Sequence, residues 1–104
     1  MLELPFRADL CQQNGFVHAG ALTTLADSAC GYAAMSLQPP ERDILTVEFK
    51  VNLMSPAVGQ RFRATATVVR AGRTLTVCAA EVHCDDDSRP IAVMQATLMA
   101  VPAA

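Results

Sequence analysis

Residues 19–35 predict a helix with apolar or small side chains on almost every side. A helix of that kind is normally buried on all sides. The chain has 104 residues, which is enough for one domain, and we expect residues 1–104 to form a single domain. The structure that covers this helix must therefore come from the same domain or from a second copy of it. The apolar positions are Ala21, Leu22, Leu25, Ala26, Ala29, Cys30, Tyr32, Ala33 and Ala34.

One narrow polar stripe interrupts this apolar surface. Thr23, Thr24, Asp27 and Ser28 lie at helical spacing, and Asp27 is the only charged residue of the segment. A buried carboxylate costs several kcal/mol unless it is paired or protonated. Either the threonine hydroxyls or solvent in a groove satisfy Asp27, or it faces a cleft as a general base or nucleophile.

The remaining segments predict strands joined mostly by hairpins. An apolar residue stands at every second position from Leu45 to Leu53, which predicts one buried and one polar face. In the fourth strand the alternation of apolar and polar residues shifts by one position near Ala79 and Ala80, which predicts a bulge there. The last strand is apolar on both faces, as in a central or interface strand. The expected strands cover residues 2–7, 45–53, 61–68, 75–84 and 91–101.

The simplest way to bury such a helix is to wrap a curved antiparallel sheet of about five strands around it, which is an α+β fold. The outer face of this sheet remains partly apolar. We therefore expect two sheets to meet across a dimer.

Composition excludes several classes of function. The net charge is −2 with no cluster of Lys and Arg, so nucleic-acid binding is not expected. No apolar run reaches the ~18 residues of a membrane span, and the N-terminus lacks the features of a signal peptide. We therefore expect a cytoplasmic protein whose four cysteines are reduced and fill the core. Their spacing does not suit zinc, and no metal site is expected.

His18 stands nine residues before Asp27, at the expected start of the helix. Nine residues correspond to about 13 Å along a helix, so the two side chains of one chain cannot meet. In a dimer with antiparallel helices, Asp27 of one chain could approach the helix start of the other. Free backbone N–H groups around Ala19 and Gly20 could then stabilise negative charge on a carbonyl oxygen.

Two segments carry a resemblance to a known family. The run Gln12-Gln13-Asn14-Gly15-Phe16-Val17-His18-Ala19-Gly20, followed by Asp27 on a helix, resembles the hotdog-fold acyl-CoA thioesterases of the PaaI (phenylacetate-pathway) type. The likeness continues through residues 45–57 and 70–75. It implies a hotdog fold and a homo-oligomer, either a dimer or a dimer of dimers. It also implies hydrolysis of acyl-CoA or aryl-acyl-CoA to the acid and coenzyme A, without a cofactor other than the CoA of the substrate.

The resemblance also implies roles for individual residues. Asp27 would be the catalytic carboxylate, Gln12 would bind near the thioester carbonyl or the water, and Thr46 would position the water. The N–H of residue 19, with Gly20 in the same turn, would polarise the carbonyl, while His18 shapes the loop. Alanine at position 19 replaces the glycine of the family but keeps the N–H. The expected substrate-binding residues are Asn14, Gly15, Arg70 and Arg73, where the arginines either meet CoA phosphates or are solvated residues of a hairpin.

Two other functions remain open. An acyl-CoA-binding module without turnover would keep the fold, although the presence of Asp27 favours chemistry. A hotdog hydratase or dehydratase would rely on a catalytic histidine, and the second histidine, His83, lies on a predicted strand away from the site. The sequence specifies neither the acyl group nor the choice between dimer and tetramer.

Overall fold

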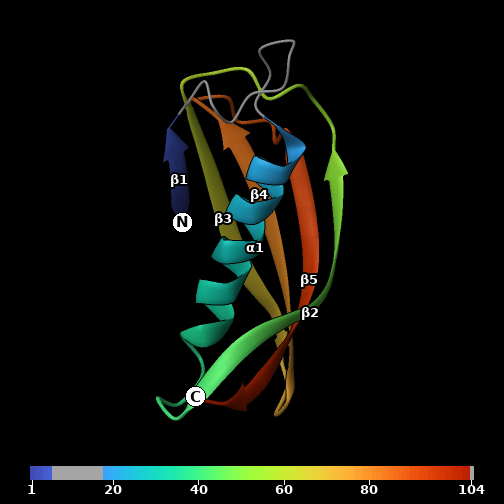
Figure 1. Ribbon diagram of the computed structural model, residues 1–104. Coiled ribbons are helices and arrows are strands. Elements are labelled where there is room, and N and C mark those ends of the chain that lie inside the picture. The colour runs from blue at the N-terminus through green and yellow to red at the C-terminus, as the bar shows by residue number, and fades with distance from the viewer. Residues whose placement is uncertain (6–17, 104) are drawn as a thin grey trace.

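The computed structural model describes residues 1–5 and 18–103. One helix lies against one face of a five-stranded antiparallel sheet with the strand order β1-β3-β4-β5-β2 (Figure 1). This is the curled sheet and single helix expected of the hotdog fold, so the predicted fold class is confirmed. The elements are β1 (Leu2–Pro5), α1 (Ala19–Met35), β2 (Arg42–Leu53), β3 (Arg61–Ala71), β4 (Leu75–Cys84) and β5 (Ala92–Pro102).

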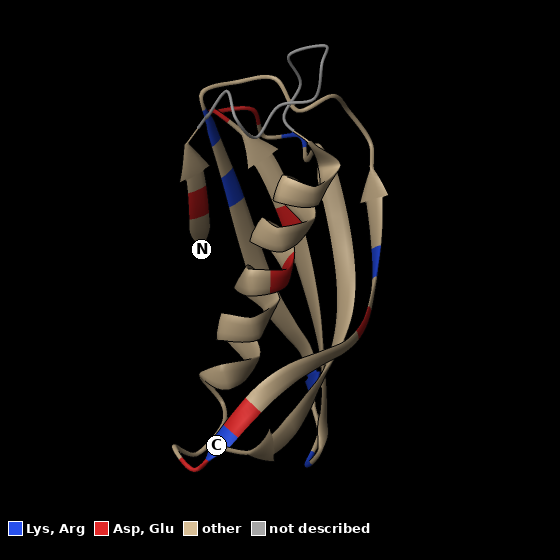
Figure 2. Cartoon of the chain, in the orientation of Figure 1, with Lys and Arg blue, Asp and Glu red and all other residues tan. Residues whose placement is uncertain are grey.

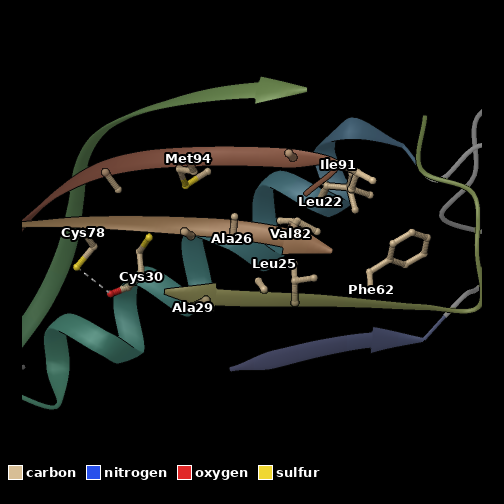
Figure 3. Packing of buried hydrophobic residues seen from close by; sticks show 14 of the residues in the cluster. Leu22, Leu25, Ala26, Ala29, Cys30, Phe62, Cys78, Val82, Ile91 and Met94 are labelled. Atoms are coloured by element: carbon tan, nitrogen blue, oxygen red, sulfur yellow. Dashed lines mark hydrogen bonds between the residues drawn. The ribbon is translucent and has the colours of Figure 1, made fainter. Parts of the chain in front are cut away.

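The core lies between α1 and the inner face of the sheet, which is the face toward the helix (Figure 3). Apolar side chains from β3, β4 and β5 meet one side of α1, and Phe62, Cys78 and Leu98 have no exposed surface. Cys30, Cys78 and Cys84 are buried free thiols, as predicted, and the Cys78 thiol donates to the Cys30 carbonyl oxygen at 3.7 Å. Cys11 lies outside the described residues. The helix contributes Leu22, Leu25, Ala26, Ala29, Cys30 and Ala34 to this core.

The predicted bounds of the helix are confirmed, but the prediction that it is buried on every side is wrong for the single chain. The sheet covers one side of α1 and leaves the other open (Figure 1). Tyr32 is 65% exposed and Met35 is 41% exposed. The error arises because an apolar pattern reports which side chains avoid water without saying which molecule covers them.

Strand β2 lies at the edge of the sheet and pairs with β5 alone. Leu45 is opposite Met99 and Glu48 is opposite Thr97, which leaves Val47 as a bulge. A bulge reverses the alternation, so Leu45 lies on the outer face while Phe49 lies on the inner face. The predicted division into one buried and one polar face is therefore wrong, and both residues are about half-exposed.

The bulge predicted near Ala79 and Ala80 is also wrong, because β4 pairs with β5 in unbroken register. The second irregularity instead falls in β3, where Val69 has no opposite residue in β4. Strand β3 continues to Ala71, so Arg70 belongs to a strand rather than to the hairpin connection. At Gly72 the chain turns so closely that an added Cβ would lie 2.6 Å from the Leu75 carbonyl oxygen.

Among the described residues, no helix is long and apolar enough to cross a bilayer. Figure 2 shows that charged residues are sparse on α1. Asp27 is its only charged residue, so this carboxylate stands alone on an otherwise uncharged helix.

Candidate active site

Asp27 lies in the middle of α1, on the side that faces the edge strand β2. Its carboxylate is half-buried and accepts a hydrogen bond from the Thr46 hydroxyl, with 2.8 Å between Thr46 Oγ1 and Asp27 Oδ1. Thr46 is opposite the buried Leu98, which places it on the inner face immediately before the Val47 bulge. The resemblance alone had connected these two residues, and the structure brings them into direct contact.

A hollow of about 290 Å³ opens beside this pair, between α1 and β2. Its Asp27 side is polar, whereas the remainder is lined largely by apolar side chains. Asp27 is the only charged residue among the described residues of the lining, so the hollow places a single carboxylate beside a mainly apolar surface. The lining residues are Asp27, Ser28, Gly31, Tyr32, Met35, Ile44, Thr46 and Leu98.

Sequence reasoning missed most of this lining. Gly31 and Met35 follow Asp27 at intervals of four residues along α1. Helical spacing could therefore have placed them on the same face. Ile44 and Leu98 could not have been found in this way, because their position depends on the register between β2 and β5.

The start of α1 is a second cluster of polar groups. His18 is the N-cap residue, and its Nδ1 accepts a hydrogen bond from the Gly20 N–H at 2.9 Å. Because Nδ1 accepts, a neutral His18 carries its proton on Nε2. The Ala21 N–H donates to the His18 carbonyl oxygen at 2.9 Å. Among the described residues, the Gly20 and Ala21 N–H groups therefore both have acceptors, whereas the Ala19 N–H has none.

The single chain does not bring the helix start and Asp27 together. They are separated by nine residues of the same helix, or about 13 Å. Arg70 is opposite Val77 on the outer face of the sheet, and Arg73 lies in the β3–β4 hairpin, so neither stands beside Asp27. Gln12, Asn14 and Gly15 lie outside the described residues.

The buried thiols near Asp27 are poor candidates for a nucleophile. Burial, together with the neighbouring Cys78 and Asp27, raises the pKa of the Cys30 thiol to about 12. Burial also raises the pKa of Cys78. A thiol attacks as the thiolate, so both are inert near neutral pH. Within the described part of the chain, no three His, Cys, Asp or Glu side chains gather in a way that could hold a metal ion.

Residues 14–91 match the profile of the Thioesterase superfamily, which is more than half of the chain. The chain belongs to the thioesterase superfamily. Its membership agrees with the hotdog architecture described above. The match does not distinguish the PaaI type from other members of the superfamily.

Several solved structures and curated proteins are similar to this superfamily member. A thioesterase family protein from Silicibacter pomeroyi is 52% identical and has a TM-score of 0.93, with 97% of this chain and 76% of that chain covered. A Bacillus halodurans protein solved with CoA has a TM-score of 0.92 at 24% identity, over 95% of this chain and 69% of that chain. At that identity the likeness concerns the fold alone.

Among curated proteins, a candidate esterase of Halobacterium salinarum is 35% identical over 81 residues, which cover 73% of this chain and 53% of the relative. The chain spans about half the length of the curated relatives it matches.

Proposed function

We propose that this thioesterase-superfamily chain hydrolyses thioesters of coenzyme A. The observation that carries the proposal is the Asp27 carboxylate, held by the Thr46 hydroxyl at the polar side of an apolar hollow. The family membership and the 52%-identical thioesterase family protein support the reaction class. The relative solved with CoA supports the leaving group only through its shared fold.

In the proposed reaction, Asp27 either takes a proton from water or attacks the thioester carbonyl carbon itself. If water attacks, its oxygen forms the new C–O bond, the C–S bond breaks, and the proton that Asp27 took passes to the CoA thiolate. If Asp27 attacks, the C–S bond breaks to leave a mixed anhydride on Asp27, and water hydrolyses that anhydride in a second step. By either route the products are a carboxylic acid and the thiol of CoA. Thr46 orients the carboxylate or the water, and Gln12 is proposed to bind the same water or the carbonyl. Neither a metal ion nor another cofactor takes part in this scheme.

The proposed oxyanion donor is the Ala19 N–H of a second copy. It lies at the positive end of the helix dipole, and the His18 side chain accepts a hydrogen bond from the Gly20 N–H and not from this group. His18 fixes this turn through its bond to Gly20. Because one chain separates these donors from Asp27 by about 13 Å, the proposed site is shared between two chains.

The edge strand β2 is the surface proposed to join the two copies. It is 12 residues long, its free edge is unpaired among the described strands, and its inner-face residues Phe49 and Leu53 are about half-exposed. Pairing of two β2 edges would continue the sheet and cover these side chains. It would also bring the α1–β2 side of each chain, which carries Asp27, toward the other chain.

The roles of the substrate-binding residues are proposed from the family resemblance. Arg73 in the hairpin, with Arg70 nearby on the outer face, offers positive charge to CoA phosphates, and Asn14 and Gly15 are proposed to border the thioester. Membership of the PaaI type belongs to the same proposal. It predicts that aryl-acyl-CoA compounds are among the substrates.

A free-thiol assay tests the proposed function. Phenylacetyl-, hydroxybenzoyl-, short-chain and medium-chain acyl-CoA are each incubated with wild type and with Asp27→Asn. We expect turnover in the wild type and a loss of at least about 100-fold in Asp27→Asn, because a general base contributes 10²–10⁴-fold.

Asp86→Asn is the matched control, because Asp86 is an exposed carboxylate in the turn that follows β4, outside both α1 and β2. It should retain full activity. Absence of turnover on every thioester, with acyl-CoA still bound, would favour the non-catalytic module instead. Loss of an enoyl absorbance without release of thiol would favour the hydratase.

A further inference from the structure

Gly31 lies in the interior of α1, between Asp27 and the end of the helix. The described residues give no structural reason for a glycine at this position. Glycine in a helix interior is less stable than alanine, so a retained glycine usually serves a positive φ or a close approach. Gly31 has ordinary helical backbone, and a Cβ built on it meets no heavy atom within 4 Å. Neither usual reason applies within the chain.

The space that a side chain would fill is in the hollow beside Asp27. Gly31 stands one helical turn after Asp27 on the same face, and both line the hollow together with Thr46. Any side chain at position 31 would therefore project into the space next to the Asp27–Thr46 pair. Glycine keeps that space open at the expense of helix stability.

The remainder of the hollow indicates what the space accepts. Beyond Asp27, Ser28 and Thr46, the lining is apolar and is made by Tyr32, Met35, Ile44 and Leu98. Among the described lining residues there is no Lys, Arg or His, so this part of the hollow does not suit a phosphate. An apolar acyl group could lie along it with its carbonyl carbon at the Asp27 side.

Three hollows in the described residues are larger, and the one bordered by Leu2 and Val68 does not include Asp27. The other two fit this guest no better. The one between β1 and α1 is mostly apolar, but it also carries Glu3 and does not include Asp27. The one near the turn that follows β4 is lined by Asp85, Asp87 and Arg89 and also lacks it. A thioester seated in either would leave its carbonyl away from the Asp27–Thr46 pair.

We propose that Gly31 determines substrate size: its missing side chain admits an apolar acyl group of several carbons, which lies between α1 and β2 against Met35 and Ile44. The proposal rests on the proposed thioesterase function and extends it to the acyl group. It assigns Gly31 to substrate contact and not to the reaction itself.

The test compares wild type, Gly31→Ala and Gly31→Leu on acetyl-, butyryl-, hexanoyl- and phenylacetyl-CoA. We expect kcat/KM for hexanoyl- and phenylacetyl-CoA to fall about tenfold in Gly31→Ala and further in Gly31→Leu, while acetyl-CoA turnover changes less than threefold. One methylene of misfit in an apolar pocket is worth roughly 10–200-fold, which sets this scale. Gly31→Ala should also raise the melting temperature by about 2–6 °C.

Ala33→Leu is the matched control. It adds a side chain to the same turn of α1, but into the hollow bordered by Leu2 and Val68. It should leave the acyl-length profile as in the wild type. A changed profile in Ala33→Leu with an unchanged profile in the Gly31 variants would place the acyl group elsewhere and overturn the proposal.

A binding measurement separates failure of this proposal from failure of the proposed function. Titration calorimetry with non-hydrolysable S-ethyl-CoA and S-hexyl-CoA needs no turnover. We expect Gly31→Leu to weaken S-hexyl-CoA at least tenfold and S-ethyl-CoA little. Equal effects on both, or a lower assembly mass with uniform loss of activity, would make Gly31 a contact between copies and overturn the proposal even if the wild type is a thioesterase.

Discussion

The hydrogen bond between Thr46 and Asp27 joins a residue of β2 to a residue of α1. A single substitution at Thr46 can remove it without changing the carboxylate. Thr46→Val keeps the shape of the side chain and deletes the hydroxyl donor. We expect kcat/KM to fall about tenfold or more, because Asp27 loses the group that fixes its orientation. Thr46 is exposed, so the melting temperature should change little.

Thr46→Ser is the control for this change, since it retains the hydroxyl at the same position. It should keep most of the activity. If the valine and serine variants are equally active, the hydrogen bond does not serve the reaction.

The buried Cys30 thiol makes the fold sensitive to alkali. Burial raises its folded pKa from 9.0 to about 12, so the thiol stabilises the fold fully below pH 9 and this contribution is lost as pH rises toward 12. At pH 10 the unfolded thiol is mostly ionised while the folded one is protonated. The resulting loss of stability relative to pH 8 is on the order of 1 kcal/mol.

Cys30→Ala removes this titration and leaves the other thiols in place. The difference in the free energy of unfolding between wild type and Cys30→Ala should therefore narrow by on the order of 1 kcal/mol between pH 8 and pH 10. Urea unfolding at both pH values measures it. A difference that stays constant would mean that the Cys30 thiol ionises as easily in the folded protein as in the unfolded chain.

At the scale of the element, α1 depends on its first turn as much as on its apolar face. The His18 Nδ1 accepts the Gly20 N–H, so His18→Ala leaves that donor without its cap. We expect the variant to lose about 1 kcal/mol of stability. His18→Asn supplies another capping acceptor and should retain most of it. Denaturant midpoints of the three proteins check this, and equal midpoints would show that the cap contributes nothing.

The elements also explain which predictions from the sequence succeed. The bounds of α1 and of β4 follow from local sequence, because a continuous helical segment covers residues 19–35 and turn residues flank residues 75–84 on both sides. The Val47 bulge does not follow from it, because Leu45 to Leu53 alternates perfectly in the sequence. Pairing with β5 introduces the bulge. No local pattern contains that information.

The same distinction applies to the candidate site. Asp27 could be singled out because a lone charge on an apolar helix requires an explanation. Its contact with Thr46 and the wall formed by Ile44 and Leu98 depend on the register of β2 against β5. Gly31 attracts attention only when the open space beside it is known. Local chemistry therefore identified the carboxylate, and tertiary geometry identified its surroundings.

At the scale of the whole molecule, the proposed site requires Asp27 of one chain and the Ala19 N–H of another. Ala19→Pro removes that N–H with little harm to the helix, because proline is well tolerated at the first helical position. His18 already has φ −61° and ψ 140°, which suits a residue before proline. Ala19→Pro and Asp27→Asn should each be folded and nearly inactive.

Mixing the two inactive variants tests whether the site is shared between chains. In a mixed dimer one of the two sites combines an intact Asp27 with an intact Ala19 N–H, while the other site carries both substitutions. Random pairing makes half of the dimers mixed, so co-expressed or co-refolded variants should recover about a quarter of wild-type activity. Native mass spectrometry measures the mixed fraction. Complementation arises only when one chain supplies the Asp27 carboxylate and the other supplies the Ala19 N–H. If mixed dimers form and no activity returns, either both groups act within one chain or the Ala19 N–H takes no part in the reaction.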